Sequence, residues 1–201
     1  LEKYKKKIEA LYNIKINIYG FDSGEGIPSS NNKFDLPFHW KQGDFTTDKD
    51  KLEKITKSKI IYGDIKTSID EFIKYEPKNI IAIFFDMDLY TSTKNFLNQV
   101  DKIQKYFAPR VYCYFDDIFN PNHWINKDVG EQLAIEEFNL ENKNLKIGLA
   151  PDSVNDFKFP LAKGQLFMLN HFDHPDYRKY IGFEGEGTLS INDNKIKTKI
   201  F

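Results

Sequence analysis

The feature that most constrains the fold is a repeated order of strand and helix, in which four predicted strands end in an aspartate. Apolar or alternating segments predict these strands at 14–21, 59–62, 79–85 and 110–115. The acids that follow them are Asp22, Asp64, Asp86 and Asp116. Helical spacing predicts helices between the strands at 49–57, 67–75 and 91–107. This order predicts an α/β fold with a Rossmann-like, doubly wound, mostly parallel sheet in a three-layer sandwich.

The remaining segments complete this outline. Residues 2–12 and 128–139 are predicted to be helical, and 145–149 and 165–170 to be the last two strands. Because no clear helix separates those strands, we expect them to form an antiparallel pair at one edge. The nearly continuous apolar segment 79–85 is typical of a central strand buried on both faces. We expect one domain over 1–182, with 183–201 as a C-terminal extension or tail.

Several further elements carry expectations of their own. The segment 91–107 is predicted to be the longest helix, ended by Pro109. Residues 27–48 form a long loop with several aromatic side chains, and loops of this length are usually functional or act as lids.

Composition excludes some classes of function. The chain has 201 residues, with 29 Lys and Arg against 30 Asp and Glu, so its net charge is -1. A nearly neutral chain gives no general electrostatic argument for binding nucleic acid or a membrane. The single cysteine, Cys113, excludes an internal disulfide and a cysteine-based zinc site, and its apolar strand context predicts a buried thiol. No segment reaches membrane-spanning length and no secretory signal is present, so the expected location is cytoplasmic.

The acids at the strand ends are predicted to share one edge of the sheet. Ligands of open parallel sheets bind beyond the carboxyl ends of the strands. Asp86 and Asp88 lie two residues apart, so a continuing strand would point both carboxylates the same way. With Asp116 and Asp117 they could form an oxygen-ligand site for a hard cation such as magnesium. The structural alternatives are helix capping near Thr91 and ion pairing of the acids with Lys94 or Arg110.

Four segments, in order, resemble the macrocin O-methyltransferase-like family of class I S-adenosylmethionine-dependent methyltransferases. YGFDSGEGIP at 19–28 resembles the family's FDSFEGLP segment, and DMDLY at 86–90, with Thr91 and Thr93, resembles DVDLYxxT. RVYCYFDD at 110–117 resembles the strand that ends in the family's paired acids. GEQLAI at 130–135 resembles a helix that follows in uncharacterised members. The resemblance spans roughly residues 14–140, and the combination is specific where a single motif is not.

The resemblance implies a role for each acid. The counterparts of Asp86, Asp116 and Asp117 bind magnesium, and that of Asp88 is the general base on a sugar hydroxyl. Asp22 would accept hydrogen bonds from the ribose hydroxyls of S-adenosylmethionine, and Asp64 from its adenine amino group. We expect Ser23, Gly63 and Asp86 to border the cofactor as well. The implied acceptor is a sugar, a natural product or another small hydroxyl compound.

One part of the family pattern has no counterpart in these residues. The first strand and Gly-rich turn, which hold the methionine end of the cofactor, would precede Leu1. In the usual strand order that strand lies centrally, between the strands ending at Asp22 and Asp86. An incomplete sheet edge would also favour association of the chain into a homo-oligomer.

Two other functions fit parts of the sequence. The strand ending in Asp86-Met87-Asp88 also resembles the haloacid dehalogenase-like phosphatase motif, with Asp86 as nucleophile, although Tyr90 stands where that motif has Thr. A third alternative is a degenerate, non-catalytic methyltransferase-like module that binds a partner.

Histidines outside the acidic segments are further candidates for binding roles. Residues 171–174 contain two histidines and an aspartate that could ligate a metal, but their composition favours a surface turn. The pairs His39-Trp40 and His123-Trp124 lie in loops, where they could pack as aromatic anchors or contact a ligand.

Overall fold

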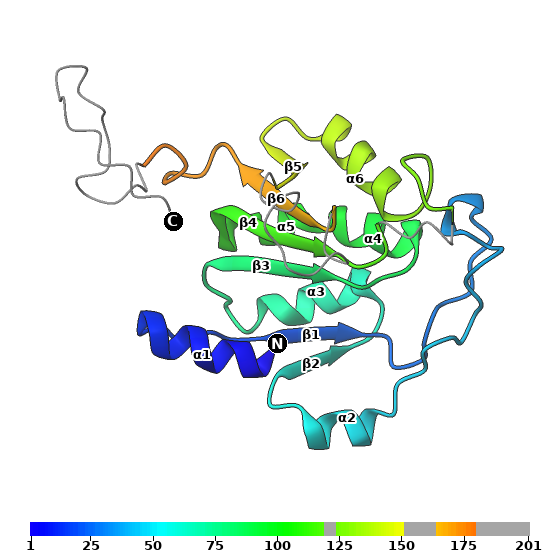
Figure 1. The fold of residues 1–201 in the computed structure, drawn as a ribbon, viewed down its shortest axis with the longest axis horizontal. Coiled ribbons are helices and arrows are strands. Elements are labelled where there is room, and N and C mark those ends of the chain that lie inside the picture. Colours follow the sequence, from blue (N-terminus) through cyan, green and yellow to red (C-terminus); the bar gives the residue numbers. More distant parts are fainter. Residues whose placement is uncertain (119–123, 151–163, 180–201) are drawn as a thin grey trace, which may run out of the picture.

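The computed structural model describes residues 1–118, 124–150 and 164–179 (Figure 1). The predicted tail at 183–201, and with it the domain boundary, lies outside the described residues. The helical elements are α1 (Glu2–Tyr12), η1 (Lys33–Asp35), α2 (Lys49–Ile55), α3 (Ile65–Ile73), α4 (Tyr90–Leu97), α5 (Val100–Ile103), η2 (Gln104–Tyr106) and α6 (Gly130–Glu141). The strands are β1 (Tyr19–Asp22), β2 (Lys59–Tyr62), β3 (Ile80–Phe85), β4 (Phe107–Phe115), β5 (Leu145–Leu149) and β6 (Leu166–His171).

The described strands form two sheets. One has the order β3-β4-β6-β5, and the other is the parallel pair β1-β2. β3 pairs with β4 in parallel, whereas β6 is antiparallel to both β4 and β5. β3, β4 and β5 therefore share one direction, and β5 with β6 forms the antiparallel edge pair that the sequence predicts. The α/β class with a mostly parallel, Rossmann-like arrangement is confirmed.

The two sheets are separated between β1 and β3. These strands run in the same direction in Figure 1, and no hydrogen bonds pair them. This is the position at which the sequence analysis placed the strand without a counterpart. α3 connects the two sheets, because Phe72 packs edge-on against Tyr19 and Phe21 of β1 at 5.0 and 5.4 Å between ring centroids, while α3 also contacts α4.

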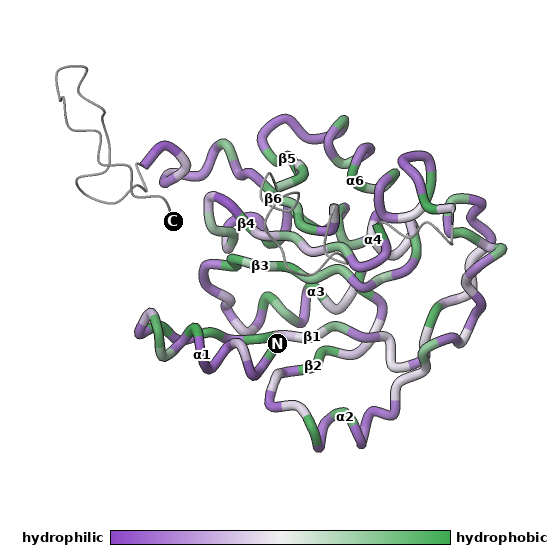
Figure 2. The backbone as a smooth tube through the Cα atoms, viewed as in Figure 1, coloured by the Kyte–Doolittle hydropathy of each residue, from purple (hydrophilic) through white to green (hydrophobic). Residues whose placement is uncertain are grey.

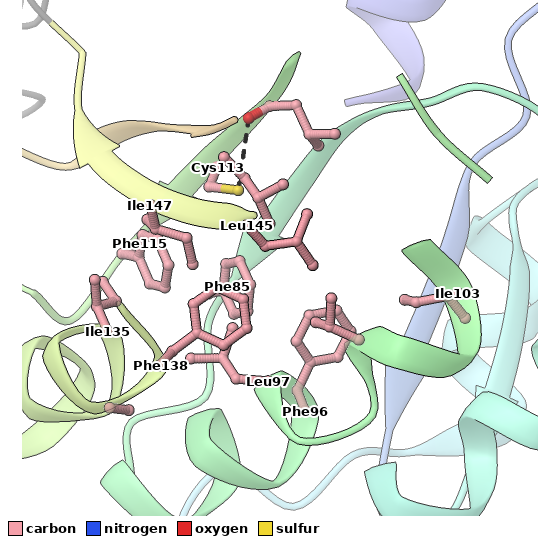
Figure 3. Packing of buried hydrophobic residues seen from close by; sticks show 14 of the residues in the cluster. Phe85, Phe96, Leu97, Ile103, Cys113, Phe115, Ile135, Phe138, Leu145 and Ile147 are labelled. Atoms are coloured by element: carbon pink, nitrogen blue, oxygen red, sulfur yellow. Dashed lines mark hydrogen bonds between the residues drawn. The ribbon is translucent and has the colours of Figure 1, made fainter. Parts of the chain in front are cut away.

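The core lies between one face of the four-stranded sheet and the helices α3, α4 and α6 (Figure 3). The rings of Phe85 and Phe115, on neighbouring parallel strands, stack with centroids 4.2 Å apart. Phe96 of α4 meets Phe85 edge-on at 5.1 Å, and Phe138 of α6 is buried in the same cluster. Cys113 is buried there too, as predicted. This packing fixes the ends of β3 and β4 relative to each other.

Described side chains on the opposite face of the same sheet are exposed, which corrects the prediction that β3 is buried on both faces. Figure 2 shows hydrophobic residues along the strands. Nevertheless Phe84 and Tyr112 are each 54% exposed and Ile81 is 49% exposed. Side chains alternate between the faces of a strand, so the helices cover the face of Phe85 and leave that of Phe84 uncovered. An apolar run alone does not reveal whether a second layer covers it.

The predicted helix 91–107 is also corrected. It is broken into α4, α5 and η2, and the longest described helix is α6. The predicted end residue Phe107 instead begins β4 and is buried opposite Ile80. Pro109 lies inside β4, where the register shifts between Ile80 and Ala82, because proline has no N–H to give to a regular ladder. Apolar residues at helical spacing continue across the breaks between these elements, so the sequence pattern does not indicate them.

The other element boundaries agree within a few residues, except that β1 begins at Tyr19 rather than at residue 14. Among the described residues, no helix combines the length and the apolar character that crossing a membrane requires.

Candidate functional site

The paired acids meet at the carboxyl ends of β3 and β4. Phe85 and Phe115 are register partners, and the N–H of Asp116 donates to the Phe85 carbonyl at 3.0 Å. Asp86 and Asp116 therefore follow side by side from neighbouring strands. The carbonyl of Asp116 accepts a 2.6 Å hydrogen bond from Gln165, which fixes this corner from β6. The structure thus brings together the acids that the strand-end pattern singled out.

Asp88 has an unusual backbone at this corner. Its φ of 59° is in the left-handed region, which an aspartate tolerates but which costs free energy. Its N–H donates to Oδ2 of Asp117 at 3.3 Å, so the two residues are held against each other. The turn stops Asp88 from continuing β3, so the expectation that its side chain simply extends the strand does not hold.

The pKa values of the clustered acids are raised. Burial raises the pKa of Asp88 to about 7, with smaller contributions from Asp117, Asp86, Asp116 and Asp44. Burial, followed by Asp116 and Asp86, raises the pKa of Asp117 to about 6, against the lowering effect of the Asp88 N–H. The pKa of Asp86 is raised by burial and by Asp116. A carboxyl with a pKa near neutrality can take a proton at physiological pH.

The two cations proposed as structural partners are engaged elsewhere. Lys94 pairs with Glu137 at 3.1 Å and Glu141 at 2.8 Å. The Arg110 guanidinium lies over the Tyr177 ring at 4.4 Å from its centroid. The alternative that Lys94 or Arg110 neutralises the acids is therefore wrong, and the mutual repulsion of the acids contributes to their raised pKa values.

The arrangement does not by itself form a metal site. Within 1–118, 124–150 and 164–179, no three His, Cys, Asp or Glu side chains are grouped so that they could hold a metal ion. The Oδ1 atom of Asp116 accepts a hydrogen bond from the Tyr114 hydroxyl at 2.8 Å. Oxygen donors of the right kind are present, but as placed they do not converge on one cation.

The predicted cofactor residues lie on the β1–β2 pair. Asp22 Oδ1 accepts the Gly24 N–H at 2.5 Å and Oδ2 accepts the Thr47 hydroxyl at 3.2 Å. The Gly63 N–H donates to the Asp22 carbonyl at 3.0 Å, which joins the ends of β1 and β2. Each carboxylate oxygen of Asp22 accepts one of these hydrogen bonds and keeps acceptor capacity, as ribose hydroxyls require.

Ser23 and Asp64 also have local structural roles. The Ser23 hydroxyl donates to the Gly26 carbonyl at 2.9 Å and accepts the Glu25 N–H at 3.1 Å. Asp64 caps α3 by accepting the Lys66 N–H at 2.8 Å. Capping uses one oxygen of Asp64, so its other oxygen remains available as an acceptor.

The segment 43–47 links the two groups of acids. Ile27 and Asp44 are joined by a 2.8 Å backbone hydrogen bond, and Thr47 contacts Asp22. Asp44 in turn contributes to the raised pKa of Asp88. Gly26 permits this approach, because a Cβ at its φ of 78° would lie 2.3 Å from the Asp44 carbonyl oxygen. The long loop thus closes over the carboxyl edge of both sheets.

A small cavity of about 130 Å³ lies in this loop beside the acidic corner. Asp35 and Trp40 line it, and so does Leu89, the residue that follows Asp88. Asp35 is buried and accepts the N–H and the hydroxyl of Thr91 at 2.6 and 2.7 Å, so it caps α4. The alternative that the clustered acids cap the helix near Thr91 is therefore wrong, because Asp35 has that role. The sequence pattern indicates its loop but not Asp35 itself.

A second acid was also missed. Glu131, in the first turn of α6, has no exposed surface, and the Thr93 hydroxyl donates to its Oε1 at 3.4 Å. The backbone N–H of Asp117 lies near the same carboxyl and favours its charged form. Burial, with Asp117 and Asp88, raises its pKa well above the usual range. The GEQLAI segment at 130–135 contains Glu131, but the polar residues next to Glu131 do not indicate that it is buried.

The histidine candidates do not join the acidic corner. His171 pairs with Leu145 at the opposite end of the sheet from Asp116, since β6 is antiparallel to β4. His39 packs edge-on against Trp40 at 4.1 Å between ring centroids. Trp124 is 76% exposed and lies 6.0 Å from the Phe38 ring, and His123 lies outside the described residues.

No protein-family model matches the chain, and no curated protein sequence matches it. Among solved structures, the chain is similar to the apo structure of CalS11, a TDP-rhamnose 3'-O-methyltransferase of calicheamicin biosynthesis. The sequences are 19% identical, the TM-score is 0.45, and the match covers 82% of this chain and 64% of CalS11. The chain therefore spans less than two thirds of that protein. At this identity and TM-score, the likeness carries no argument for activity.

Proposed function

We propose that the chain is a methyltransferase that transfers the methyl group of S-adenosylmethionine to a hydroxyl of a sugar or another small compound. The observation that carries the proposal is Asp88, a half-buried carboxyl beyond the carboxyl end of β3 whose pKa is raised to about 7. The four motif resemblances and the acids at the ends of β1, β2 and β4 support it.

In the proposed reaction, Asp88 acts as the general base. S-adenosylmethionine, when bound, supplies a methyl group on a positively charged sulfur. Asp88 takes the proton of the acceptor hydroxyl while the oxygen forms its bond to the methyl carbon. The carbon–sulfur bond breaks and S-adenosylhomocysteine leaves with the electron pair of that bond. The hydrogen bond from the Asp88 N–H to the Asp117 side chain holds the base in place.

The residues at the ends of β1 and β2 are proposed to hold the cofactor. Asp22 accepts from the ribose hydroxyls and Asp64 from the adenine amino group, with Ser23, Gly63 and Asp86 bordering the site. The chemistry of these donors and acceptors fits, because both carboxylates keep free acceptor positions.

Magnesium at Asp86, Asp116 and Asp117 is a separate part of the proposal. The mutual raising of the pKa values supports a cation, since a positive charge between carboxylates relieves their repulsion. The described geometry would have to close around the ion to bind it, so no step of the proposed reaction depends on it.

The variant Asp88→Asn tests the function. Asparagine cannot take the proton, so formation of S-adenosylhomocysteine should fall by about 100- to 10,000-fold. The assay uses S-adenosylmethionine with a panel of pyranosides and TDP-rhamnose, and calorimetry with S-adenosylhomocysteine should show similar affinity for both proteins. Unchanged turnover in the variant removes Asp88 as the base.

The same samples separate the alternatives. Release of phosphate from an aryl phosphate, lost in Asp86→Asn, would favour the phosphatase. Neither activity, together with no binding of S-adenosylhomocysteine, would favour the binding module and contradict the methyltransferase.

Metal dependence is tested by the double variant Asp116→Ala with Asp117→Ala. If these acids bind magnesium, the wild-type protein should lose turnover on treatment with a chelator and regain it with magnesium, and the double variant should show no such response. Calorimetric titration with magnesium checks binding directly. Magnesium activation that survives in the double variant rejects this site.

A further inference from the structure

Glu131 is a fully buried acid that the proposed reaction does not use. It lies in the first turn of α6, with no exposed surface, and its Oε2 atom has no hydrogen-bond partner among the described residues. A buried carboxyl oxygen without a partner costs free energy, so its retention needs an explanation. A buried apolar residue at the same position would avoid that cost.

The contacts of Glu131 lead directly to the proposed base. The Thr93 hydroxyl of α4 donates to its Oε1 atom at 3.4 Å, and the backbone N–H of Asp117 lies near the carboxyl and lowers its pKa. The side chain of Asp117, in turn, accepts the backbone N–H of Asp88 at 3.3 Å. A series of polar contacts, with hydrogen bonds at both ends, therefore runs from α4 and α6 to the turn that carries Asp88.

The neighbouring residue of α6 acts on the same segment. Gln132 donates through its side-chain amide to the carbonyl of Ile118 at 2.8 Å. Two consecutive residues of the first turn of α6 thus face two consecutive residues after β4, and Gln132 is hydrogen-bonded to its partner. The helix contacts α4 and β5, and its Phe138 lies in the core, so it is a firm support for this segment.

We propose that Glu131 is a positioning residue, which holds Asp117 through its backbone and thereby fixes Asp88 in its left-handed turn. The inference deepens the proposed function and rests on it only for the turnover measurement. The acceptor oxygen performs the role and the negative charge does not, so glutamine should replace glutamate. A residue whose side chain is too short, or that has no acceptor oxygen, should fail to hold Asp117.

Three substitutions at this position, with one control, test the proposal. Glu131→Gln keeps an acceptor in place, Glu131→Met keeps the length without an acceptor, and Glu131→Asp keeps the charge but is one methylene shorter. The control Phe138→Leu disturbs the packing of the same helix without touching the acidic corner. Amide hydrogen exchange at Asp117 and Asp88 is the primary measurement, and methyl transfer with cofactor affinity is the second.

The proposal predicts faster exchange at both amides, by about tenfold, in the methionine and aspartate variants, as expected from loss of one hydrogen bond. Their turnover should fall with little change in the affinity for S-adenosylhomocysteine, whereas the glutamine variant should match the wild type. If the methionine variant does not fold, the exchange rates of the aspartate variant test the proposal. Unchanged exchange in a folded aspartate or methionine variant, or equal effects in Phe138→Leu, overturns the inference. A wild type that transfers no methyl group refutes the function alone, because the exchange pattern is read without it.

Discussion

At the scale of single residues, Asp88 combines three costly properties. It has a left-handed backbone, it is half-buried, and it lies among other acids. Such strain persists where the surrounding structure enforces it, and it is concentrated at functional sites. We therefore expect that Asp88, in its proposed role as the base, lowers the free energy of unfolding.

The variant Asp88→Asn should accordingly be more stable than the wild type at pH 8. The folded-state pKa of about 7 is above the ordinary value of 3.8, so the folded protein binds the proton more tightly. This contribution is present below pH 3.8 and is lost as the pH rises through about 7. Asparagine does not ionise and tolerates a left-handed backbone, so the variant escapes the loss.

Thermal unfolding at pH 5 and pH 8 checks this prediction. The melting temperature of the variant relative to wild type should rise between the two pH values. The exposed Asp128 supplies a control, since Asp128→Asn should show no comparable trend. A variant less stable than wild type at pH 8 would show that Asp88 is not held under electrostatic strain.

The sequence could predict the acids at the ends of strands, because each follows directly from an apolar segment. It could not predict Asp35 or Glu131, which are polar in the sequence and buried only by tertiary packing. The left-handed turn at Asp88 also depends on Asp117, a partner that lies 29 residues away.

At the scale of secondary structure, most elements follow from periodicity alone, and β2 and β5 have the predicted bounds. The prediction of a single helix at 91–107 was wrong because apolar residues at helical spacing do not indicate where one helix ends and the next begins. Burial of Phe107 against Ile80 decides that this residue starts a strand. At this residue, pairing and burial in the sheet override the local helical pattern.

Asp64 allows the capping role of an acid to be separated from its proposed role in cofactor binding. Serine and aspartate cap helices about equally well, but the serine side chain is shorter. Asp64→Ala should therefore lower the free energy of unfolding by about 1 kcal/mol, whereas Asp64→Ser should leave it nearly unchanged. Both should weaken binding of S-adenosylhomocysteine, as measured by calorimetry. Wild-type affinity in Asp64→Ser would leave Asp64 with the capping role alone.

At the scale of the whole molecule, the two sheets are unequal. The four-stranded sheet has a helical layer on one face, whereas β1 and β2 form a pair that is marginal without support. The described support is α3, through the contacts of Phe72 with Tyr19 and Phe21. The cofactor residues and the acidic corner therefore lie on two units that are joined by α3 and by the bonds of Asp35 to Thr91 of α4.

Phe72→Ala should consequently uncouple the two units. Amide exchange in β1 and β2 should become faster, while β4 and β6 keep their protection, because Phe72 packs against β1 and not against those strands. The matched variant Phe138→Ala should instead affect the four-stranded sheet first. Equal acceleration in all strands after Phe72→Ala would show that the molecule unfolds as one unit.

The central claim is that the acids from β3 and β4 converge and give Asp88 the pKa of a base. A carboxyl carbon-13 NMR titration of Asp88 measures this without an acceptor or a cofactor. We predict an inflection near pH 7, which moves to lower pH in Asp117→Asn because one neighbouring charge is removed. An inflection near pH 3.8 that Asp117→Asn leaves unmoved would contradict the convergence and, with it, the proposed role of Asp88.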